Sequence, residues 1–523
     1  MMIRAVAFAL LLLPVPFLGQ GLTADELLKP AGASWPTYNG DYTGQRHSPL
    51  HAIDAHNVGG LELAWTYRAS NYGAGGFGAQ IKSTPLQVNG VLYFTMPDNV
   101  WAVDARTGRE IWHYKYPPNQ GNHIGQRGVA MWGQWLYFET PDCNLVSLSA
   151  KDGKERWRKK IADVSLEYFC TMAPLVVGNH LVTGVGGDSL DNPGYLLSLD
   201  PETGEQQWRW NTEPKAGEPG ADTWPDDDSR RHGGGMTWMT GTYDPELHLL
   251  YWGTGNPNPV HAGAGRKGDN LWTCSIVALN VDTGKMVWGY QVSPHDTHDW
   301  DATQTPVLFD GAFQGKQRKM VAQASRNGYF FVLDRVTGEH LLTAPFIHSN
   351  WSLGINAKGQ PIPNPAKEPA RNGTLVSPSS SGASNWFAPS FDPALGLFYV
   401  VASQSYSIFY LTAEGKAEGF GGRDDYLNFP GEVKAIDYKT GKPRWTHDVG
   451  GMGAGILTTA GNVLFTGDSS AHFMALDAAT GKTLWHTALG ANQANGAIAY
   501  ELDGRQYVVV GAGDSLYAFA AAR

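Results

Sequence analysis

The chain has 523 residues and a formal net charge of −10, and charged residues make up only 17% of it. The small share of Lys and Arg argues against nucleic acid or another polyanion as a partner. Its 64 glycines and 12% aromatic content predict an all-β protein rich in turns and argue against a disordered chain.

The first twenty residues have the layout of an export signal. Arg4 precedes an apolar run from Ala5 to Leu18, and small residues follow. We therefore expect residues 1–20 to be a signal peptide, residues 21–523 to form one domain, and the mature protein to be periplasmic without a stable membrane span. A retained membrane anchor is the alternative, which the shortness of the run and its two prolines disfavour.

A thirteen-residue pattern recurs seven times: an apolar run, an Asp or a substitute, then Thr-Gly or Asp-Gly, and usually a Trp four residues after the Gly. Each copy predicts two strands joined by a tight turn, because Asp and Thr oxygens accept bonds from turn amides and the Gly takes a positive φ. The copies are Val100–Trp112, Leu145–Trp157, Leu196–Trp208, Ile276–Trp288, Phe330–Leu342, Val433–Trp445 and Phe473–Trp485.

The spacing of the turn glycines gives the size of the repeated unit. The steps from Gly108 to Gly153 and from Gly441 to Gly481 are close to the roughly 40 to 50 residues of a four-stranded propeller blade. A segment around Trp65 and the C-terminal LYAFAAAR would share one further blade as a closing strand pair. The sequence therefore predicts an eight-bladed β-propeller of four-stranded antiparallel blades.

Two steps between repeats are much longer than one blade. They run from residue 204 to 284 and from 338 to 441, and they contain degenerate copies that begin at Tyr243 and Phe391. We expect insertions in these two steps. We also expect the active site there, near the propeller axis where segments of different blades converge.

The three cysteines, Cys143, Cys170 and Cys274, are isolated and lie in apolar, strand-like contexts. We therefore expect three buried thiols and no disulfide. The chain has no Cys-x-x-Cys-His motif, which excludes a covalently attached c-type haem. Any electrons must leave through a separate partner.

The densest polar cluster is PHDTHDWDATQTP, residues 294–306. If this segment is extended, Asp299 and Asp301 lie on one face, where two carboxylates repel unless a cation or a proton lies between them. Such oxygen-rich sites suit Ca²⁺ or another hard cation. A solvated loop with acidic residues capping turns is the alternative.

Other candidate site residues lie on different blades. Asn256, in GTGN, offers a carboxamide oxygen, and three glycines precede Thr237 and Trp238, whose indole offers a flat stacking surface. A structural corner is the alternative for this glycine segment. Arg127 and Arg326 offer planar guanidinium groups that suit carboxylates on a bound anion or, equally, inter-blade ion pairs.

Together these residues resemble the pyrroloquinoline quinone (PQQ) dependent alcohol dehydrogenases, the methanol and ethanol dehydrogenase family of periplasmic quinoproteins. The resemblance covers nearly the whole mature chain, from WPTYNGDYTGQRHSPL at residues 35–50 through GGGMTW, GTGN, PHDTHDWD, RNGYFFVLDR and SNWFAPSFDP. It implies oxidation of an alcohol to an aldehyde or ketone, with hydride transfer to a metal-activated quinone. The implied cofactors are PQQ and Ca²⁺ or a lanthanide ion, and the implied electron acceptor is a soluble cytochrome.

The matching motifs imply a role for each candidate. Asp299 is similar to the family's catalytic base beside the metal, and Asp301 to the additional carboxylate of its lanthanide-using branch. The implied metal ligands are Asp188, Asn256, Asp299 and Asp301. Trp238 is similar to the family's residue that stacks beneath the PQQ ring, and Arg326 to the residue that contacts the reactive quinone oxygens. The other implied cofactor contacts are Arg127, Thr171 and Asn385.

The chain also departs from the family pattern. Gly121-Asn122 replaces a vicinal cysteine pair, and Lys82 replaces a Glu, which adds a positive charge near the expected cofactor site. At a turn where relatives carry a metal-binding Glu, Ser189 is in line, Asp188 is one residue out of register, and Asp191 is the other candidate. His298 replaces a Trp, and GGMGAGIL, residues 450–457, lacks an aromatic residue that relatives place near the quinone.

Two other functions remain open at this point. The same repeats build non-catalytic propeller scaffolds, such as outer-membrane assembly factors, and a degenerate quinoprotein without a cofactor lies between the two. Aldose or polyol oxidation with the same cofactor is a close variant of the first hypothesis.

Overall fold

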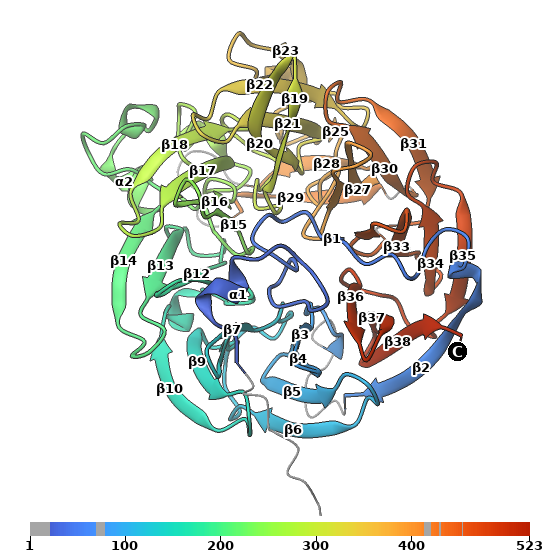
Figure 1. Ribbon diagram of the computed structural model, residues 1–523. Coiled ribbons are helices and arrows are strands. Elements are labelled where there is room, and N and C mark those ends of the chain that lie inside the picture. Colours follow the sequence, from blue (N-terminus) through green and yellow to red (C-terminus); the bar gives the residue numbers. More distant parts are fainter. Residues whose placement is uncertain (1–20, 70–78, 413–419, 428–429, 452, 523) are drawn as a thin grey trace, which may run out of the picture.

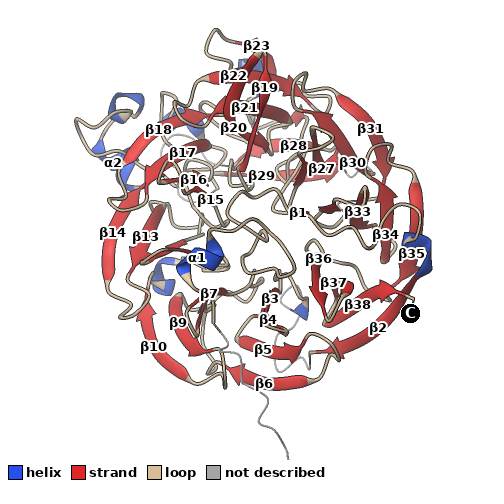
Figure 2. Ribbon diagram, in the orientation of Figure 1, coloured by secondary structure: helices blue, strands red, loops and turns tan. Residues whose placement is uncertain are grey.

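The computed structural model describes residues 21–69, 79–412, 420–427, 430–451 and 453–522. These residues contain two short α-helices, α1 (Ala24–Leu27) and α2 (Asp227–Arg231), and are otherwise mainly β-structure and loops (Figure 2). Five short 3-10 helices lie in the loops: Val58–Gly60, Val164–Leu166, Ala221–Thr223, Gly263–Gly265 and Pro365–Lys367. The predicted signal peptide, residues 1–20, lies outside the described residues. No helix in the described ranges has both the length and the apolarity needed to cross a membrane.

Most strands belong to antiparallel sheets of four that are arranged in a ring (Figure 1). In the first five sheets the strands lie side by side in their sequence order: β3 (Leu86–Val88), β4 (Val91–Met96), β5 (Asn99–Asp104) and β6 (Glu110–Lys115); β7 (Ala130–Trp132), β8 (Trp135–Glu139), β9 (Asn144–Ser149) and β10 (Glu155–Lys160); β11 (Leu175–Val177), β12 (His180–Gly184), β13 (Tyr195–Leu199) and β14 (Gln206–Asn211); β15 (Thr242–Asp244), β16 (Leu249–Gly253), β17 (Ser275–Asn280) and β18 (Met286–Gln291); β19 (Val307–Phe313), β20 (Lys316–Ala324), β21 (Tyr329–Asp334) and β22 (His340–Pro345).

Three further sheets complete the ring. They are formed by β26 (Ser390–Asp392), β27 (Leu397–Ser403), β30 (Gly431–Asp437) and β31 (Pro443–Asp448); by β32 (Leu457–Thr459), β33 (Val463–Gly467), β34 (His472–Asp477) and β35 (Thr483–Ala488), with β1 (His47–Ser48) parallel to β32; and by β36 (Ile498–Leu502), β37 (Arg505–Ala512), β38 (Ser515–Ala521) and β2 (Leu61–Arg68). β2 pairs antiparallel with β38, from Leu61 opposite Ala521 to Arg68 opposite Ser515. The predicted closing strand pair is therefore confirmed.

The two long steps between repeats hold insertions, as expected. α2 lies in the first step, and the degenerate copy there forms β15 and β16. The second step holds a two-stranded sheet, β23 (Ser352–Ile355) with β24 (Pro361–Pro363), and a three-stranded sheet, β25 (Thr374–Val376), β28 (Tyr406–Leu411) and β29 (Gly422–Leu427). Its degenerate copy forms β26 and β27.

The repeated turn joins the third and fourth strands of a sheet. Between β5 and β6, Asp104 Oδ1 accepts hydrogen bonds from the backbone amides of Arg106 at 3.0 Å and Thr107 at 2.9 Å. Gly108 follows with a φ of 70°, in the region that favours glycine. The turn chemistry predicted from the repeat is therefore confirmed.

The repeated Trp joins neighbouring sheets. The indole of Trp65 donates to the Ala105 carbonyl of the next sheet at 3.1 Å, and a Cβ on Gly108 would lie 2.6 Å from its ring. Equivalent bonds run from Trp112 to Ala150 (3.0 Å), Trp208 to Val281 (2.8 Å), Trp288 to Arg335 (3.2 Å) and Trp445 to Ala478 (3.0 Å). The repeat thus closes one hairpin and also packs its Trp beneath the turn of the following sheet.

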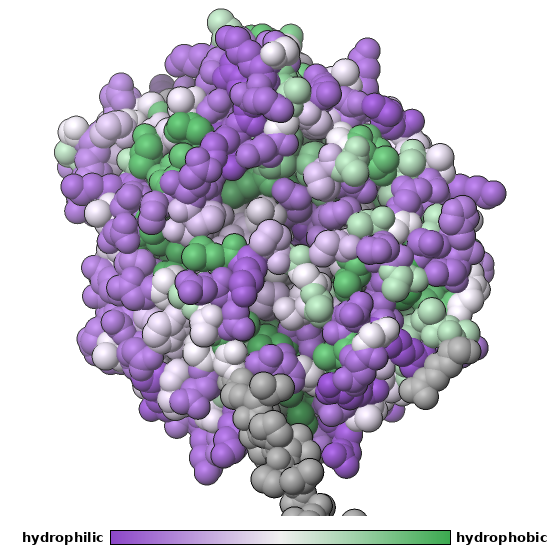
Figure 3. Space-filling view, viewed as in Figure 1, coloured by the Kyte–Doolittle hydropathy of each residue, from purple (hydrophilic) through white to green (hydrophobic). Residues whose placement is uncertain are grey.

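The segment of residues 35–48, blue in Figure 1, runs across the middle of the ring. Backbone carbonyls of its residues accept hydrogen bonds from inner strands of three sheets, at Tyr243 (3.0 Å), Leu308 (2.7 Å) and Phe391 (2.8 Å). Arg46, only 1% exposed, donates to the carbonyls of Ile456 and Ala497. This segment therefore connects sheets that are far apart in sequence. On the face shown in Figure 3, polar residues cover most of the rim of the ring.

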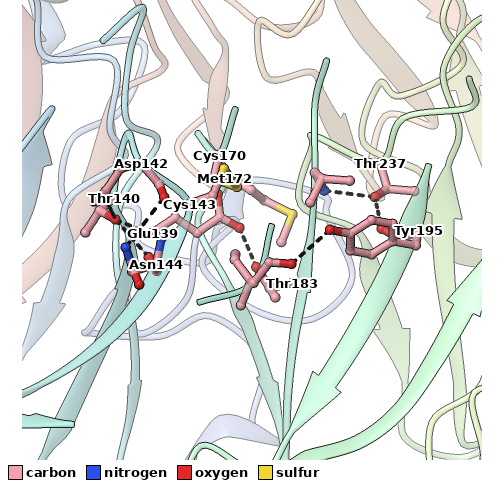
Figure 4. Close-up of a disulfide and its surroundings, with 12 residues drawn as sticks. Glu139, Thr140, Asp142, Cys143, Asn144, Cys170, Met172, Thr183, Tyr195 and Thr237 are labelled. Atoms are coloured by element: carbon pink, nitrogen blue, oxygen red, sulfur yellow. Dashed lines mark hydrogen bonds between the residues drawn. A yellow bond between two sulfur atoms is a disulfide. The ribbon is translucent and has the colours of Figure 1, made fainter. Parts of the chain in front are cut away.

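Two of the three cysteines form a disulfide, so the prediction of three thiols is wrong for them (Figure 4). Cys143, directly before β9, is bonded to Cys170 in the loop before β11, and Cys274 is a free, buried thiol. The two cysteines are 27 residues apart on neighbouring sheets, so their proximity depends on how the sheets pack. The disulfide fixes the backbone next to Thr171, one of the candidate cofactor contacts.

Candidate active site

The candidate residues share one end of the ring. Neighbouring strands in each sheet run in opposite directions. The loop before the first strand therefore lies at the same end of the ring as the loop between the second and third strands. The repeated turns, between the third and fourth strands, lie at the other end. All the candidates lie in such loops: Arg127, Thr171, Trp238, Asp299, Asp301 and Asn385 before first strands, and Asp188, Asn256 and Arg326 between second and third strands. The antiparallel topology therefore gathers residues from many sheets.

The acidic segment between β18 and β19 is a turn at Asp299. This residue has a φ of 68°, a left-handed conformation that Asp tolerates, so the extended geometry considered for the segment does not hold here. Asp296 Oδ2 accepts bonds from the backbone amides of Trp300 at 3.0 Å and His298 at 3.4 Å. Asp296 thus shapes the loop that presents Asp299.

Arg326, on the turn between β20 and β21, contacts both predicted carboxylates. Its Nη1 donates to Asp301 Oδ2 at 2.7 Å, and its Nη2 lies 3.3 Å from Asp299 Oδ2. Nη2 also donates to the Ser380 carbonyl at 2.6 Å, which fixes the plane of the guanidinium group. Asp299 and Asp301 therefore lie close together, although the backbone between them is not extended.

Asp301 is the centre of a wider network. Its Oδ2 also accepts from the Trp238 indole at 2.9 Å, and its Oδ1 accepts from the Asn256 backbone amide at 2.7 Å. A Cβ on Gly255 would lie 2.7 Å from Asp301 Oδ1, so the glycine in GTGN permits this approach. One buried carboxylate thereby links Trp238, Asn256 and Arg326.

Burial and like charges shift the titration of the acidic residues. Burial, reinforced by the charge of Asp301, raises the pKa of Asp188 to about 7. Burial also raises the pKa of Asp299 well above its ordinary value, against the opposing charge of Arg326 and with Asp301 and Asp188 adding to it. Asp188, Asp299 and Asp301 therefore act on one another electrostatically.

The oxygen atoms of this acidic group suit a hard cation. Asp188 Oδ1 and Asn256 Oδ1 are buried acceptors without a hydrogen-bond partner among the described residues. A buried acceptor without a partner costs free energy, which a cation such as Ca²⁺ would offset. In the described part of the chain no three His, Cys, Asp or Glu side chains are grouped to hold a metal by themselves. The ligand set of Asp188, Asn256, Asp299 and Asp301 therefore stays a prediction.

A second group of side chains lies on the face of Trp238. The Arg127 guanidinium carbon is 4.8 Å from the centre of the Trp238 ring and 5.2 Å from that of Trp386. Thr171 accepts hydrogen bonds from Arg127 through its hydroxyl and, at 3.3 Å, its carbonyl. Arg127 Nε is a buried donor without a partner among the described residues, which suits an anionic group.

Sequence reasoning missed Trp386, although it follows the predicted contact Asn385. The Asn385 side chain donates to the Ser381 carbonyl at 2.8 Å and accepts from the Trp386 amide at 2.8 Å. Asn385 therefore shapes the loop that carries Trp386. The motif SNWFAP held the signal, because an aromatic residue beside a predicted cofactor contact is itself a candidate for stacking.

Comparison with known proteins identifies the family of this chain. A family model described as "Glucose/ethanol/alcohol dehydrogenase, beta-propeller domain" matches residues 35–363. The chain belongs to the quinoprotein alcohol dehydrogenase family. The quinoprotein alcohol dehydrogenase PedH of Pseudomonas putida is 35% identical over 507 residues, covering 90% of this chain and 84% of the relative. The quinohemoprotein alcohol dehydrogenase of Comamonas testosteroni is 35% identical over 532 residues, covering 93% of this chain and 74% of the relative.

Solved structures give the same family. The quinohemoprotein alcohol dehydrogenase ADHIIG of Pseudomonas putida HK5 matches with a TM-score of 0.90 at 31% identity, over 96% of this chain and 82% of that chain. A europium-containing methanol dehydrogenase matches with a TM-score of 0.86 at 28% identity, over 95% of this chain and 99% of that one. Residues 430–523 also match a second family model, of the outer membrane protein assembly factor BamB.

Two departures of this quinoprotein from its family's motifs have structural reasons. His298 is buried, stacks on Trp300 with ring centres 4.4 Å apart and contacts the Lys367 carbonyl, and burial lowers its pKa to about 3. It is therefore a neutral packing residue behind Asp299. At Gly121, a Cβ would lie 2.0 Å from the carbonyl carbon of Pro141, so this loop requires glycine where relatives carry a cysteine.

Proposed function

We propose that this protein is a PQQ-dependent dehydrogenase that oxidises an alcohol to an aldehyde or ketone. The observation that carries the proposal is the buried network in which Asp301 contacts Trp238, Asn256 and Arg326, with Asp299 beside the same guanidinium group. A buried ion pair of this kind is weak evidence for stability alone. Because the ion pair lies in loops at one end of the ring, a role in catalysis explains it better than a role in stability.

The residues present fit a quinone and a cation. The unpartnered buried oxygens of Asp188 and Asn256 favour a metal there, with Asp299 and Asp301 as the other protein ligands. Trp238 offers a ring on which a planar cofactor stacks, and Arg127, Thr171 and Asn385 line its other contacts. PQQ and the metal, when bound, would supply an electrophilic carbonyl that accepts hydride.

Within this site Asp299 is the proposed catalytic base. Its side chain keeps 23% of its surface exposed, whereas Asp301 keeps only 6%, so an alcohol hydroxyl can reach Asp299 more easily. Arg326 holds the Asp299 carboxylate in place and provides positive charge where negative charge develops. Asp299 would then accept the hydroxyl proton, while the carbon that bears this hydroxyl group would give its hydride to the quinone.

The domain organisation, the electron acceptor and the metal complete the proposal. We infer that residues 21–523 form one domain and that its sheets are the eight blades of one propeller, because β2 and β38 close the ring. Export to the periplasm is proposed because residues 1–20 have the layout of an export signal. A soluble cytochrome acceptor is proposed because a relative from Thauera butanivorans is named 1-butanol dehydrogenase (cytochrome c). A Ca²⁺ or lanthanide ion is proposed because Asp301 adds a carboxylate and a structural neighbour contains europium.

An absorption titration of the purified protein with PQQ, in either Ca²⁺ or La³⁺, tests this proposal. We expect stoichiometric uptake under one metal, followed by dye reduction that depends on an added alcohol or polyol. The match of residues 430–523 to BamB favours a scaffold as the second candidate. No uptake under either metal would contradict the dehydrogenase and leave the scaffold or a degenerate quinoprotein.

A further inference from the structure

Lys82 lies beside the segment that carries Arg127. The Thr84 amide donates to the Arg127 carbonyl at 3.0 Å, so residues 82–84 run alongside the loop before β7. The Lys82 ammonium donates to the Ile124 carbonyl at 2.5 Å. A Cβ on Gly125 would lie 2.7 Å from Lys82 Cδ, so the lysine stem packs directly on this loop. Lys82 is thus held against the chain two to three residues before Arg127.

The two cations share one electrostatic environment. Burial, and then the charge of Arg127, lowers the pKa of Lys82 to about 8, and burial lowers the pKa of Arg127 to about 10. The buried acid Glu139, whose charge acts on Arg127, offers little compensation, since burial raises its pKa to about 8 and leaves it largely protonated at neutral pH. An anion that contacts both cations would offset this repulsion.

The aromatic rings restrict where such an anion can lie. The Arg127 guanidinium carbon lies 4.8 Å from the centre of the Trp238 ring and 5.2 Å from that of Trp386, and its Nη1 donates to Thr171. Its unpartnered Nε remains for an in-plane acceptor. A ligand that stacks on Trp238 and carries a carboxylate at its edge would satisfy these constraints.

We propose that Lys82 and Arg127 together bind a carboxylate of the quinone cofactor, so that this chain recognises the cofactor's charge with two cations. The inference rests on the proposed function and deepens it, because PQQ is a planar tricarboxylate. Lys82 acts here as a cofactor-binding residue. It takes no part in the proton transfer assigned to Asp299.

The test is a titration of apoprotein with PQQ, in which quenching of tryptophan fluorescence gives the Kd for wild type, Lys82→Arg, Lys82→Gln and Lys82→Glu. Lys82→Arg should bind like wild type, Lys82→Gln about tenfold more weakly, and Lys82→Glu more weakly still, as expected for loss and then reversal of a charge-assisted bond. Lys285→Gln, an exposed lysine on the β17–β18 turn, is the matched control and should keep the wild-type Kd.

A second titration uses the trimethyl ester of PQQ, which lacks the carboxylate charges. Lys82→Gln should bind this ester as wild type does. Equal loss of affinity for acid and ester would show a structural effect and overturn the inference, as would an unchanged PQQ Kd in Lys82→Gln and Lys82→Glu. If wild type takes up no PQQ, the proposed function fails together with this inference. Uptake by wild type with no effect of residue 82 removes the inference alone.

Discussion

The two sides of Trp238 differ in charge. Its indole nitrogen contacts Asp301, which lies with Asp188, Asp299 and Arg326 on what we call the acidic side. Its ring face contacts Arg127, which lies with Lys82 and Thr171 on the basic side. A flat cofactor on Trp238 would thus lie with one edge near carboxylate oxygens of the protein, which bind cations, and another edge near Lys and Arg nitrogens, which bind anions. The contrast separates turnover, assigned to the acidic side, from cofactor affinity, assigned to the basic side.

The largest expected effect comes from Asp299→Asn on the acidic side. Asn tolerates the φ of 68° at this position and keeps the shape of the side chain, but it cannot accept the alcohol proton. We expect the rate of alcohol-dependent dye reduction to fall about a thousandfold, within the usual range for loss of a general base. The PQQ Kd should change little.

Asp503→Asn is the matched control for that variant. Asp503 has a φ of 54° and lies at an exposed turn where it contacts Arg106. Its replacement should leave both rate and affinity unchanged. A full rate in Asp299→Asn would contradict the role given to this carboxylate.

On the basic side, Arg127→Lys keeps the charge and removes the planar group between two indoles. We expect the PQQ Kd to rise about ten- to a hundredfold, because stacking and the fixed direction of its donors are lost. Quenching of tryptophan fluorescence during a PQQ titration measures this Kd. Arg209→Lys, whose guanidinium stacks on Tyr195 at 3.7 Å on the exposed surface, should have no effect. Equal Kd values for wild type and Arg127→Lys would place the cofactor elsewhere.

Glu139 sharpens the contrast, because it is a buried acid on the basic side. Its folded pKa of about 8 exceeds the ordinary value of 4.5, so the folded protein binds the extra proton between these values. The contribution of Glu139 to the unfolding free energy should therefore be fully present below pH 4.5 and fall as pH rises to 8, by about 1.4 kcal/mol for each pKa unit at most. Glu139→Gln should remove this decline in denaturation measured at several pH values. Exposed Glu205→Gln should retain it, and a wild-type pH dependence in Glu139→Gln would contradict the assignment.

The smallest expected effect is that of Asn256→Asp, which adds a carboxylate to the acidic side. Repulsion from Asp301 and its neighbours should lower Tm by a few degrees without a cation, and Ca²⁺ or La³⁺ should restore it. Asn280→Asp is the control, because most other copies of the repeat carry Asp at that position. A Tm of Asn256→Asp that no cation raises would argue against a metal on this side.

The features that the sequence predicts correctly depend on residues that are close together in the chain or on a repeated motif. The turn at Asp104 and Gly108 depends on residues within five positions of one another, so a repeated motif identifies it. The closing pair of β2 and β38 followed from counting repeats. The dense polar cluster of residues 294–306 identifies Asp301 as a candidate, and the resemblance supplies the roles of Asp301 and Arg326. The structure brings the two side chains to 2.7 Å from each other.

The features that the sequence does not predict depend on contacts between residues that are not neighbours in the chain, mostly on different sheets. The Cys143–Cys170 disulfide and the stacking of Trp386 on Arg127 join loops of different sheets, and no local pattern encodes those distances. The backbone turn at Asp299 likewise depends on Asp296, whose carboxylate binds the amides of the loop. Which of Asp188 and its neighbours bind a metal stays a prediction.

The most direct measurement compares PQQ affinity with single-turnover reduction of the bound quinone by alcohol, in wild type, Asp299→Asn and Arg127→Lys. The account predicts that Asp299→Asn binds PQQ like wild type and fails to reduce it. It also predicts that Arg127→Lys binds weakly but, once saturated, reduces the quinone at a rate close to that of wild type. If either variant loses affinity and reduction together, the two sides of Trp238 do not have separate roles.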